Sequence, residues 1–150
     1  MSLQRAVPAY ALGADDGERL RFGDVEVVVK ASADRTGGAF TIFEENEPAD
    51  TRLHVHEHED EVFYVLEGEH VFQVGDQEFR ASPGGVVFAP RGVPHAQRRV
   101  LPRTGRVLVL TSPAGFEGFF RHLADADRAG AIAPDSYASA SKKHGITWLG

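Results

Sequence analysis

Residues 54–61 have the sequence HVHEHEDE, which holds three of the chain's seven histidines within five positions. If this stretch is a β-strand, alternate side chains share a face, and His54, His56 and His58 can point in the same direction. Imidazole nitrogen and carboxylate oxygen are good ligands for borderline divalent metal ions. The stretch therefore favours a metal site over a solvated acidic loop, and at this level all three histidines stay open as ligands.

Short apolar and β-branched runs lie on both sides of this stretch, separated by turns rich in Gly, Pro and Asp. Such a series is typical of the strands of a sandwich or barrel. No part of the chain before residue 112 shows a sustained helical period. We predict an all-β fold whose barrel covers about residues 20–112, with strands at 25–30, 39–44, 61–66, 70–74, 77–81, 85–89 and 107–111.

After the last predicted strand the pattern becomes helical. Four apolar residues recur at the spacing of one helix face, namely Phe116, Phe119, Phe120 and Leu123. We expect Ser112 to cap this helix with Pro113 at its first position, and a second helix over 135–144 that Asp135 caps and Gly145 ends. The helical segment then covers about 113–145, and the apolar tail 146–149 is expected to pack back on the barrel.

Composition limits the class of protein. The chain has 42% hydrophobic and 25% charged residues, which is typical of a soluble globular protein. Its 150 residues are the usual size of one compact domain, so we predict a single domain over 1–150. No apolar run approaches the roughly 20 residues that span a bilayer, so no membrane partner is expected. The lack of cysteine excludes disulfides and fits a reducing cytoplasm, where we expect the protein.

A net charge of −6 argues against a nucleic-acid partner. One local basic cluster stands out against this charge, formed by Arg98, Arg99, Arg103 and Arg106. We interpret it as a solvated hairpin rather than a phosphate site. The remaining histidines outside residues 54–58 and 95 belong to no motif, and surface positions are predicted for His70, His122 and His144.

Two spaced motifs identify a family. Residues His54-x-His56, four residues, Glu61, six residues and Gly68 resemble the first motif of the cupin superfamily. The second motif is matched by Gly84, five residues, Pro90-x-Gly92, two residues and His95, while Pro48 and Arg99 stand where the motifs have Gly and Asn. The resemblance implies a double-stranded β-helix, or jelly-roll, barrel with one divalent metal ion on four ligands: His54, His56, Glu61 and His95. Iron, manganese, nickel, cobalt, copper and zinc all accept such ligands.

Strand parity suggests which residues line the space beside the metal. Glu61 and Phe63 share a face, as do His95 and Gln97, so Phe63 and Gln97 are candidate substrate contacts. Further apolar wall is expected from Phe43, Phe72 and Phe88. Glu61 is the candidate catalytic residue, because a carboxylate that leaves the metal can act as a base for a substrate hydroxyl. The face with Phe116 is expected either to cover the open end of the barrel or to act as a lid.

Residues 112–120 and 144–150 resemble the corresponding segments of bacterial single-domain cupins similar to quercetin 2,3-dioxygenase. The resemblance implies a metal-dependent dioxygenase that acts, with dioxygen, on an enolic or hydroxylated aromatic small molecule. Two alternatives stay open: an oxygen-independent isomerase or cyclase, and a non-catalytic cupin that binds a small ligand. The resemblance also implies a homodimer. His58, between the ligands, is predicted to be an exposed loop histidine.

Overall fold

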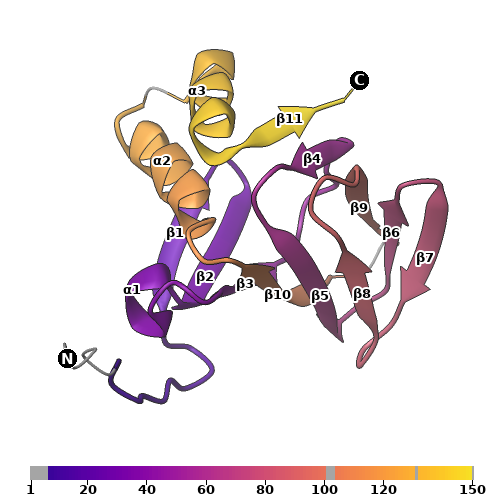
Figure 1. Cartoon of the computed structure of the whole chain (residues 1–150), viewed down its shortest axis with the longest axis horizontal. Coiled ribbons are helices and arrows are strands. Elements are labelled where there is room, and N and C mark those ends of the chain that lie inside the picture. Colours follow the sequence, from indigo (N-terminus) through magenta and orange to yellow (C-terminus); the bar gives the residue numbers. More distant parts are fainter. Residues whose placement is uncertain (1–6, 101–103, 131, 150) are drawn as a thin grey trace, which may run out of the picture.

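In the computed structural model, two antiparallel sheets face each other (Figure 1). The structure describes residues 7–100, 104–130 and 132–149. The six-stranded sheet has the order β1 (Glu18–Phe22), β2 (Val25–Ala31), β3 (Thr41–Asn46), β10 (Arg106–Ser112), β5 (Asp60–Glu67) and β8 (Val86–Ala89). The five-stranded sheet has the order β11 (Ile146–Trp148), β4 (His54–His56), β9 (His95–Arg99), β6 (His70–Val74) and β7 (Gln77–Ala81). The predicted all-β class with C-terminal helices is confirmed.

The core lies between the two sheets and follows from alternation along each strand. In β5, Phe63 and Val65 are buried whereas Tyr64 is 40% exposed. Side chains from opposite sheets meet there, and the rings of Phe63 and Phe72 are 4.8 Å apart. This alternation is what a strand with one buried face requires. The prediction missed β1 and the single helical turn α1 (Ala33–Thr36), which are short.

The two long helices stack beside β1 at one end of the molecule (Figure 1). The predicted start of the first helix at Ser112 is wrong, because Ser112 still belongs to β10 and its hydroxyl donates to the carbonyl of Ala39. The helix α2 (Glu117–Arg128) begins where the Glu117 carboxylate accepts hydrogen bonds from the Ala33 amide and the Thr41 hydroxyl. Its predicted apolar face is confirmed and buried in the core: Phe119, Phe120 and Leu123.

The C-terminal segment returns to the barrel as a strand. The helix α3 (Pro134–His144) ends at Gly145, as predicted, with Gly145 at φ 69° in the left-handed region that favours glycine. Ala133, rather than Asp135, is the N-cap, because Pro134 takes the first helical position. The tail then forms β11, which pairs with β4 so that Trp148 lies opposite His54. The expected packing of the tail on the barrel is confirmed.

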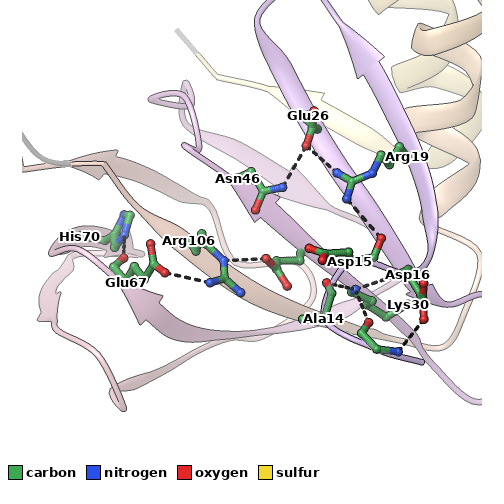
Figure 2. Close-up of polar contacts among 12 residues, drawn as sticks. Ala14, Asp15, Asp16, Arg19, Glu26, Lys30, Asn46, Glu67, His70 and Arg106 are labelled. Carbon is green, nitrogen blue, oxygen red and sulfur yellow. Dashed lines mark hydrogen bonds and ion pairs between the residues drawn. The ribbon is translucent and has the colours of Figure 1, made fainter. Parts of the chain in front are cut away.

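Two of the three described arginines of the basic cluster, Arg98 and Arg106, have acidic partners. Arg106 forms ion pairs with Glu44 at 2.7 Å and with Glu67 at 2.8 Å, and Figure 2 shows its guanidinium beside Glu67. Arg98 lies 3.4 Å from Glu78. These pairs agree with a solvated surface rather than a phosphate site. Arg103 lies outside the described residues.

The surface position predicted for His70 is wrong. Its side chain is only 1% exposed, and its Nε2 lies 3.0 Å from the carbonyl oxygen of Glu67 (Figure 2). The ring fills the space beside Gly105, where an added Cβ would come within 2.5 Å of it. His70 is the first residue of β6, and the sequence does not show which chain segments cover that position, so its burial could not be predicted. His122 and His144 are half-buried. No helix among the described residues has the length and apolar character needed to cross a bilayer.

Candidate metal centre

Three histidines from neighbouring strands converge inside the barrel. His54 and His56 are the first and last residues of β4, and His54 pairs directly with His95 of β9. All three side chains are buried, and each can offer a nitrogen atom so that the three atoms lie within 4.8 Å of one another. The Gly92 amide donates to the His56 carbonyl at 2.9 Å, which ties the turn before β9 to β4. The predicted grouping of these histidines is therefore present in the fold.

Glu61 reaches the same point from the opposite sheet. Its Oε2 lies 3.2 Å from Nε2 of His56 and 3.1 Å from Nε2 of His95. Two ligand atoms that occupy adjacent octahedral positions, each about 2.1 Å from an ion, are about 3 Å apart. The observed distances fit such an arrangement. Glu61 Oε2 is also buried without a hydrogen-bond partner among the described residues, as expected for a donor atom reserved for a cation.

The electrostatics of the cluster favour the metal-binding forms of Glu61 and His54, whereas for His56 the effect of burial is outweighed by Glu61 and Glu59, which raise its pKa in the absence of a cation. Burial opposes ionisation of Glu61, but His56, His95 and His54 outweigh it and hold the Glu61 pKa at about 2. Burial, together with the neighbouring His95, lowers the pKa of His54 to about 4. At neutral pH Glu61 is therefore an anion and His54 is a neutral imidazole. Metal ligands of both types need these protonation states.

A hydrogen-bonded carbonyl lies behind His54, and a carboxylate at ion-pair distance, without a hydrogen bond among the described residues, lies behind His56. His54 Nδ1–H donates to the Arg52 carbonyl at 2.7 Å, which leaves Nε2 free to face the cluster. His56 Nδ1 lies 3.4 Å from the buried carboxylate of Glu59, while its Nε2 faces Glu61. A carboxylate behind a ligating imidazole fixes the tautomer and the ring orientation. Sequence reasoning missed Glu59, although its place between motif residues His56 and Glu61 marks a loop that must fold back.

Aromatic rings surround the cluster. The ring of Phe63 lies 5.7 Å from that of His95, as its shared face with Glu61 predicted. The ring of Phe116, which precedes α2, lies 4.6 Å from that of His56. From the tail, the indole of Trp148 lies 4.9 Å from His54. Phe116 and Trp148 thus lie against two of the three histidines, and Trp148 is a site neighbour that sequence reasoning placed only in an apolar tail.

The other predicted wall residues lie at different distances from the cluster. Phe72 is buried behind Phe63, and Phe43 is buried against Phe120 at 4.9 Å. The interior position suggested for Phe88 is wrong, because its side chain is 53% exposed on the outer face of β8. Neighbouring residues on a strand point to opposite faces, and Val87 takes the inner one.

Of the two remaining predicted residues, Gln97 lies inside the barrel and His58 lies outside the cluster. Gln97 is buried on the His95 face of β9 and its amide donates to Glu45 of β3 at 3.0 Å. His58 is exposed and outside the cluster, as predicted, with its ring against Gly145, where an added Cβ would come within 2.5 Å. Glu45 is a second interior carboxyl group that sequence reasoning missed. Phe43 and Glu45 are two residues apart on one strand, so their side chains share a face, and this spacing could have indicated Glu45.

Residues 40–110 match the cupin domain family. A curated relative, quercetin 2,3-dioxygenase from Bacillus subtilis strain 168, is 36% identical over 122 residues. That alignment covers 80% of this chain but only 36% of the relative, so the chain spans about a third of the relative's length.

Solved structures give the same fold. KdgF from a Halomonas species superposes with a TM-score of 0.59 at 20% identity, covering 69% of this chain and 94% of that protein. A protein of Thermotoga maritima described as a predicted oxalate decarboxylase gives a TM-score of 0.54 at 26% identity, covering 59% of this chain and 80% of that protein. The likeness to KdgF shows the fold alone.

Proposed function

The chain is a cupin that resembles quercetin 2,3-dioxygenase, and from this premise we propose that it is a metal-dependent dioxygenase acting on an enolic or hydroxylated aromatic compound. The observation that carries the proposal is the buried convergence of three histidines and one carboxylate inside the barrel. Such a site, placed in a covered apolar interior, suits chemistry on a small organic molecule.

The proposed ligands are four: His54, His56, Glu61 and His95. When bound, a divalent ion supplies positive charge that lowers the pKa of a substrate hydroxyl, and coordination positions for substrate or dioxygen. Three neutral imidazoles and one carboxylate leave that charge partly uncompensated. The donor set accepts iron, manganese, nickel, cobalt, copper or zinc, so the proposal concerns one divalent ion and no particular element.

Glu61 is also the proposed proton acceptor. Its carboxylate lies 3.2 Å from Nε2 of His56 and 3.1 Å from Nε2 of His95, so a substrate hydroxyl bound at the same ion would lie beside it. Phe63, beside His95, provides an apolar surface for a planar ring. Phe72 and Phe43 extend this wall further from the histidines, and Gln97 offers the polar contact. These substrate contacts support an aromatic or enolic compound rather than a highly charged one.

The direct test combines metal loading with oxygen consumption. The metal-free protein is loaded under argon with each divalent ion in turn, and oxygen uptake is followed with quercetin and a panel of enediols and catechols. We expect uptake with at least one metal and substrate, and none with His56→Ala, whereas His122→Ala retains both metal and activity. No uptake by the metal-loaded protein with any member of the panel would refute the dioxygenase. Conversion under argon would favour the oxygen-independent isomerase or cyclase instead.

We also propose a homodimer. The strand β8 lies at the edge of its sheet, and two of its apolar side chains, Val86 at 59% and Phe88 at 53%, are exposed. An unpaired edge with apolar side chains is commonly covered by another chain. Sedimentation of Phe88→Glu against the unmodified protein tests this, since a monomer in both cases would exclude the dimer. The cytoplasmic location stays a prediction.

A further inference from the structure

A hydrogen bond joins the two sheets across the barrel interior, one step along β9 from the histidines. The Gln97 amide nitrogen donates to the Glu45 carboxyl oxygen Oε2 at 3.0 Å. Gln97 lies on the same face of β9 as His95, two residues further on. Glu45 lies opposite the fully buried Val107, on the inward face of β3 that also carries Phe43. The pair therefore borders the same interior as the proposed metal ligands.

The polar groups of this pair are not saturated. Gln97 is only 6% exposed, and its amide oxygen Oε1 is buried without a hydrogen-bond partner among the described residues. Buried acceptors of this kind are normally paired, because leaving one unpaired costs its lost hydration. The hydrogen bond from Gln97 uses one of the two Glu45 carboxyl oxygens. The pair thus has free hydrogen-bonding capacity beside the site.

When protonated, the Glu45 carboxyl group provides a hydrogen-bond donor beside the acceptor oxygen of Gln97. In the metal-free protein, partial burial, reinforced by the negative charge of Glu61, raises the pKa of Glu45 to about 8, although the bond from Gln97 acts in the opposite direction. A neutral carboxyl group carries an O–H that can donate, while the Gln97 oxygen can accept. Side by side, the two groups match a hydroxyl group, which both donates and accepts.

We propose that Glu45 and Gln97 form a subsite that binds a second hydroxyl group of the substrate, separate from the oxygen directed at the metal ligands. The inference rests on the proposed function and narrows the substrate to compounds with several hydroxyl groups. Residues two apart on a strand are separated by about 7 Å. The second hydroxyl group of the substrate is therefore several ångströms from the oxygen directed at the metal ligands.

The competing explanation is a structural one, in which the pair only holds the two sheets together and a water satisfies the Gln97 oxygen. A structural pair affects stability but does not discriminate between ligands. If the pair is a subsite, replacement of Gln97 weakens the binding of a ligand with the second hydroxyl group more than that of an analogue without it. If the pair is only structural, both ligands are affected equally. Stability alone therefore does not decide between them.

The test measures ligand discrimination under argon, independently of turnover. Quercetin and 3-hydroxyflavone share the same enolone, but 3-hydroxyflavone lacks the other four hydroxyl groups. Dissociation constants for both are measured by absorbance titration of the cobalt-loaded protein, together with the metal content of each variant. We expect the unmodified protein to prefer quercetin by about tenfold or more, as one hydrogen-bonded hydroxyl group provides.

Gln97→Leu is expected to reduce this preference to within about threefold of unity while leaving the affinity for 3-hydroxyflavone within about twofold. Gln73→Leu is the matched control, because Gln73 is exposed on the neighbouring strand β6 and its variant should keep the full preference. If Gln97→Leu does not fold, Gln97→Met, which keeps the length of the side chain but removes its amide, is measured in its place and should also reduce the preference.

Three results would overturn the subsite: no preference in the unmodified protein, equal loss of affinity for both flavonols in the variants, or no binding of either flavonol by the cobalt-loaded protein. A preference for quercetin that the variants remove, without oxygen uptake with any metal, would leave the subsite in place and refute the dioxygenase. The failure of the inference and the failure of the proposed function are thus separate outcomes.

Discussion

Replacement of Glu59 by glutamine tests whether a second carboxylate supports the metal centre from behind His56. Glu59 Oε1 lies 3.4 Å from His56 Nδ1, and the side chains of Glu59 and His56 are 7% and 3% exposed. Glu59→Gln keeps the shape of the side chain and removes its charge. We therefore expect weaker metal binding with little change in the fold.

The size of the effect follows from this distance. Two full charges 3.4 Å apart interact by about 5 kcal/mol at an effective dielectric constant of about 20, which is an upper bound. A metal-bound imidazole carries only part of a positive charge, so we expect about a third to a half of that energy. This corresponds to about 1.5–2.5 kcal/mol, or a roughly 10- to 70-fold increase in the metal Kd, within the range known for such carboxylate–histidine pairs.

The assay is a competition titration of metal-free protein with a chromophoric chelator at pH 7, using zinc, manganese and cobalt. Glu57→Gln is the control, because Glu57 lies on the same loop but is exposed, and among the described residues its carboxylate accepts a hydrogen bond from Thr147 at 3.2 Å. Its Kd should stay within about twofold of the unmodified protein. The reasoning is refuted if Glu59→Gln also stays within about twofold, or if Glu57→Gln loses as much affinity.

Two further predictions concern stability. In the folded protein the pKa of Glu45 is about 8, whereas in the unfolded chain it is about 4.5. The folded state therefore binds more protons between these pH values, and Glu45 makes folding less favourable as the pH rises from 4.5 to 8. Glu45→Gln should raise the Tm of the metal-free protein more at pH 8 than at pH 5, and equal shifts at both pH values would contradict the protonation state. Phe116→Ala should lower the free energy of unfolding in urea by about 3 kcal/mol, because the Phe116 ring is 5% exposed, whereas Leu12→Ala, at a side chain that is 41% exposed, should lower it by under about 1 kcal/mol. Similar losses in both variants would mean that Phe116 does not pack over His56 as described.

The sequence predicted those parts of the site that depend on local patterns. His54 and His56 are two residues apart on one strand, as are Glu61 and Phe63 on another, so parity predicted that each pair shares a face. The resemblance to the cupin motifs selected His54 and His56 over His58. The spacing of the two motifs then related His95 to them. The strand ranges were predicted closely for the same reason, since turns and apolar runs are local signals.

Features that depend on which distant segments meet were predicted poorly. The start of α2 depends on hydrogen bonds from Ala33 and Thr41 to Glu117, which is 84 positions from Ala33. The burial of His70 depends on Gly105, whose missing side chain makes room for the ring. Capping preferences and residue type carry no information about such contacts.

By itself, the sequence determined the all-β class, the inward face of each ligand strand and the candidate ligand set. Only the tertiary structure decided that Trp148 lies against His54, that Glu59 stands behind His56, and that Gln97 meets Glu45 across 52 positions. The physical reason is that alternation is a property of one strand, whereas contacts across the barrel depend on strand order and register. A shift of one residue in that register would turn Glu45 outward without changing any local pattern.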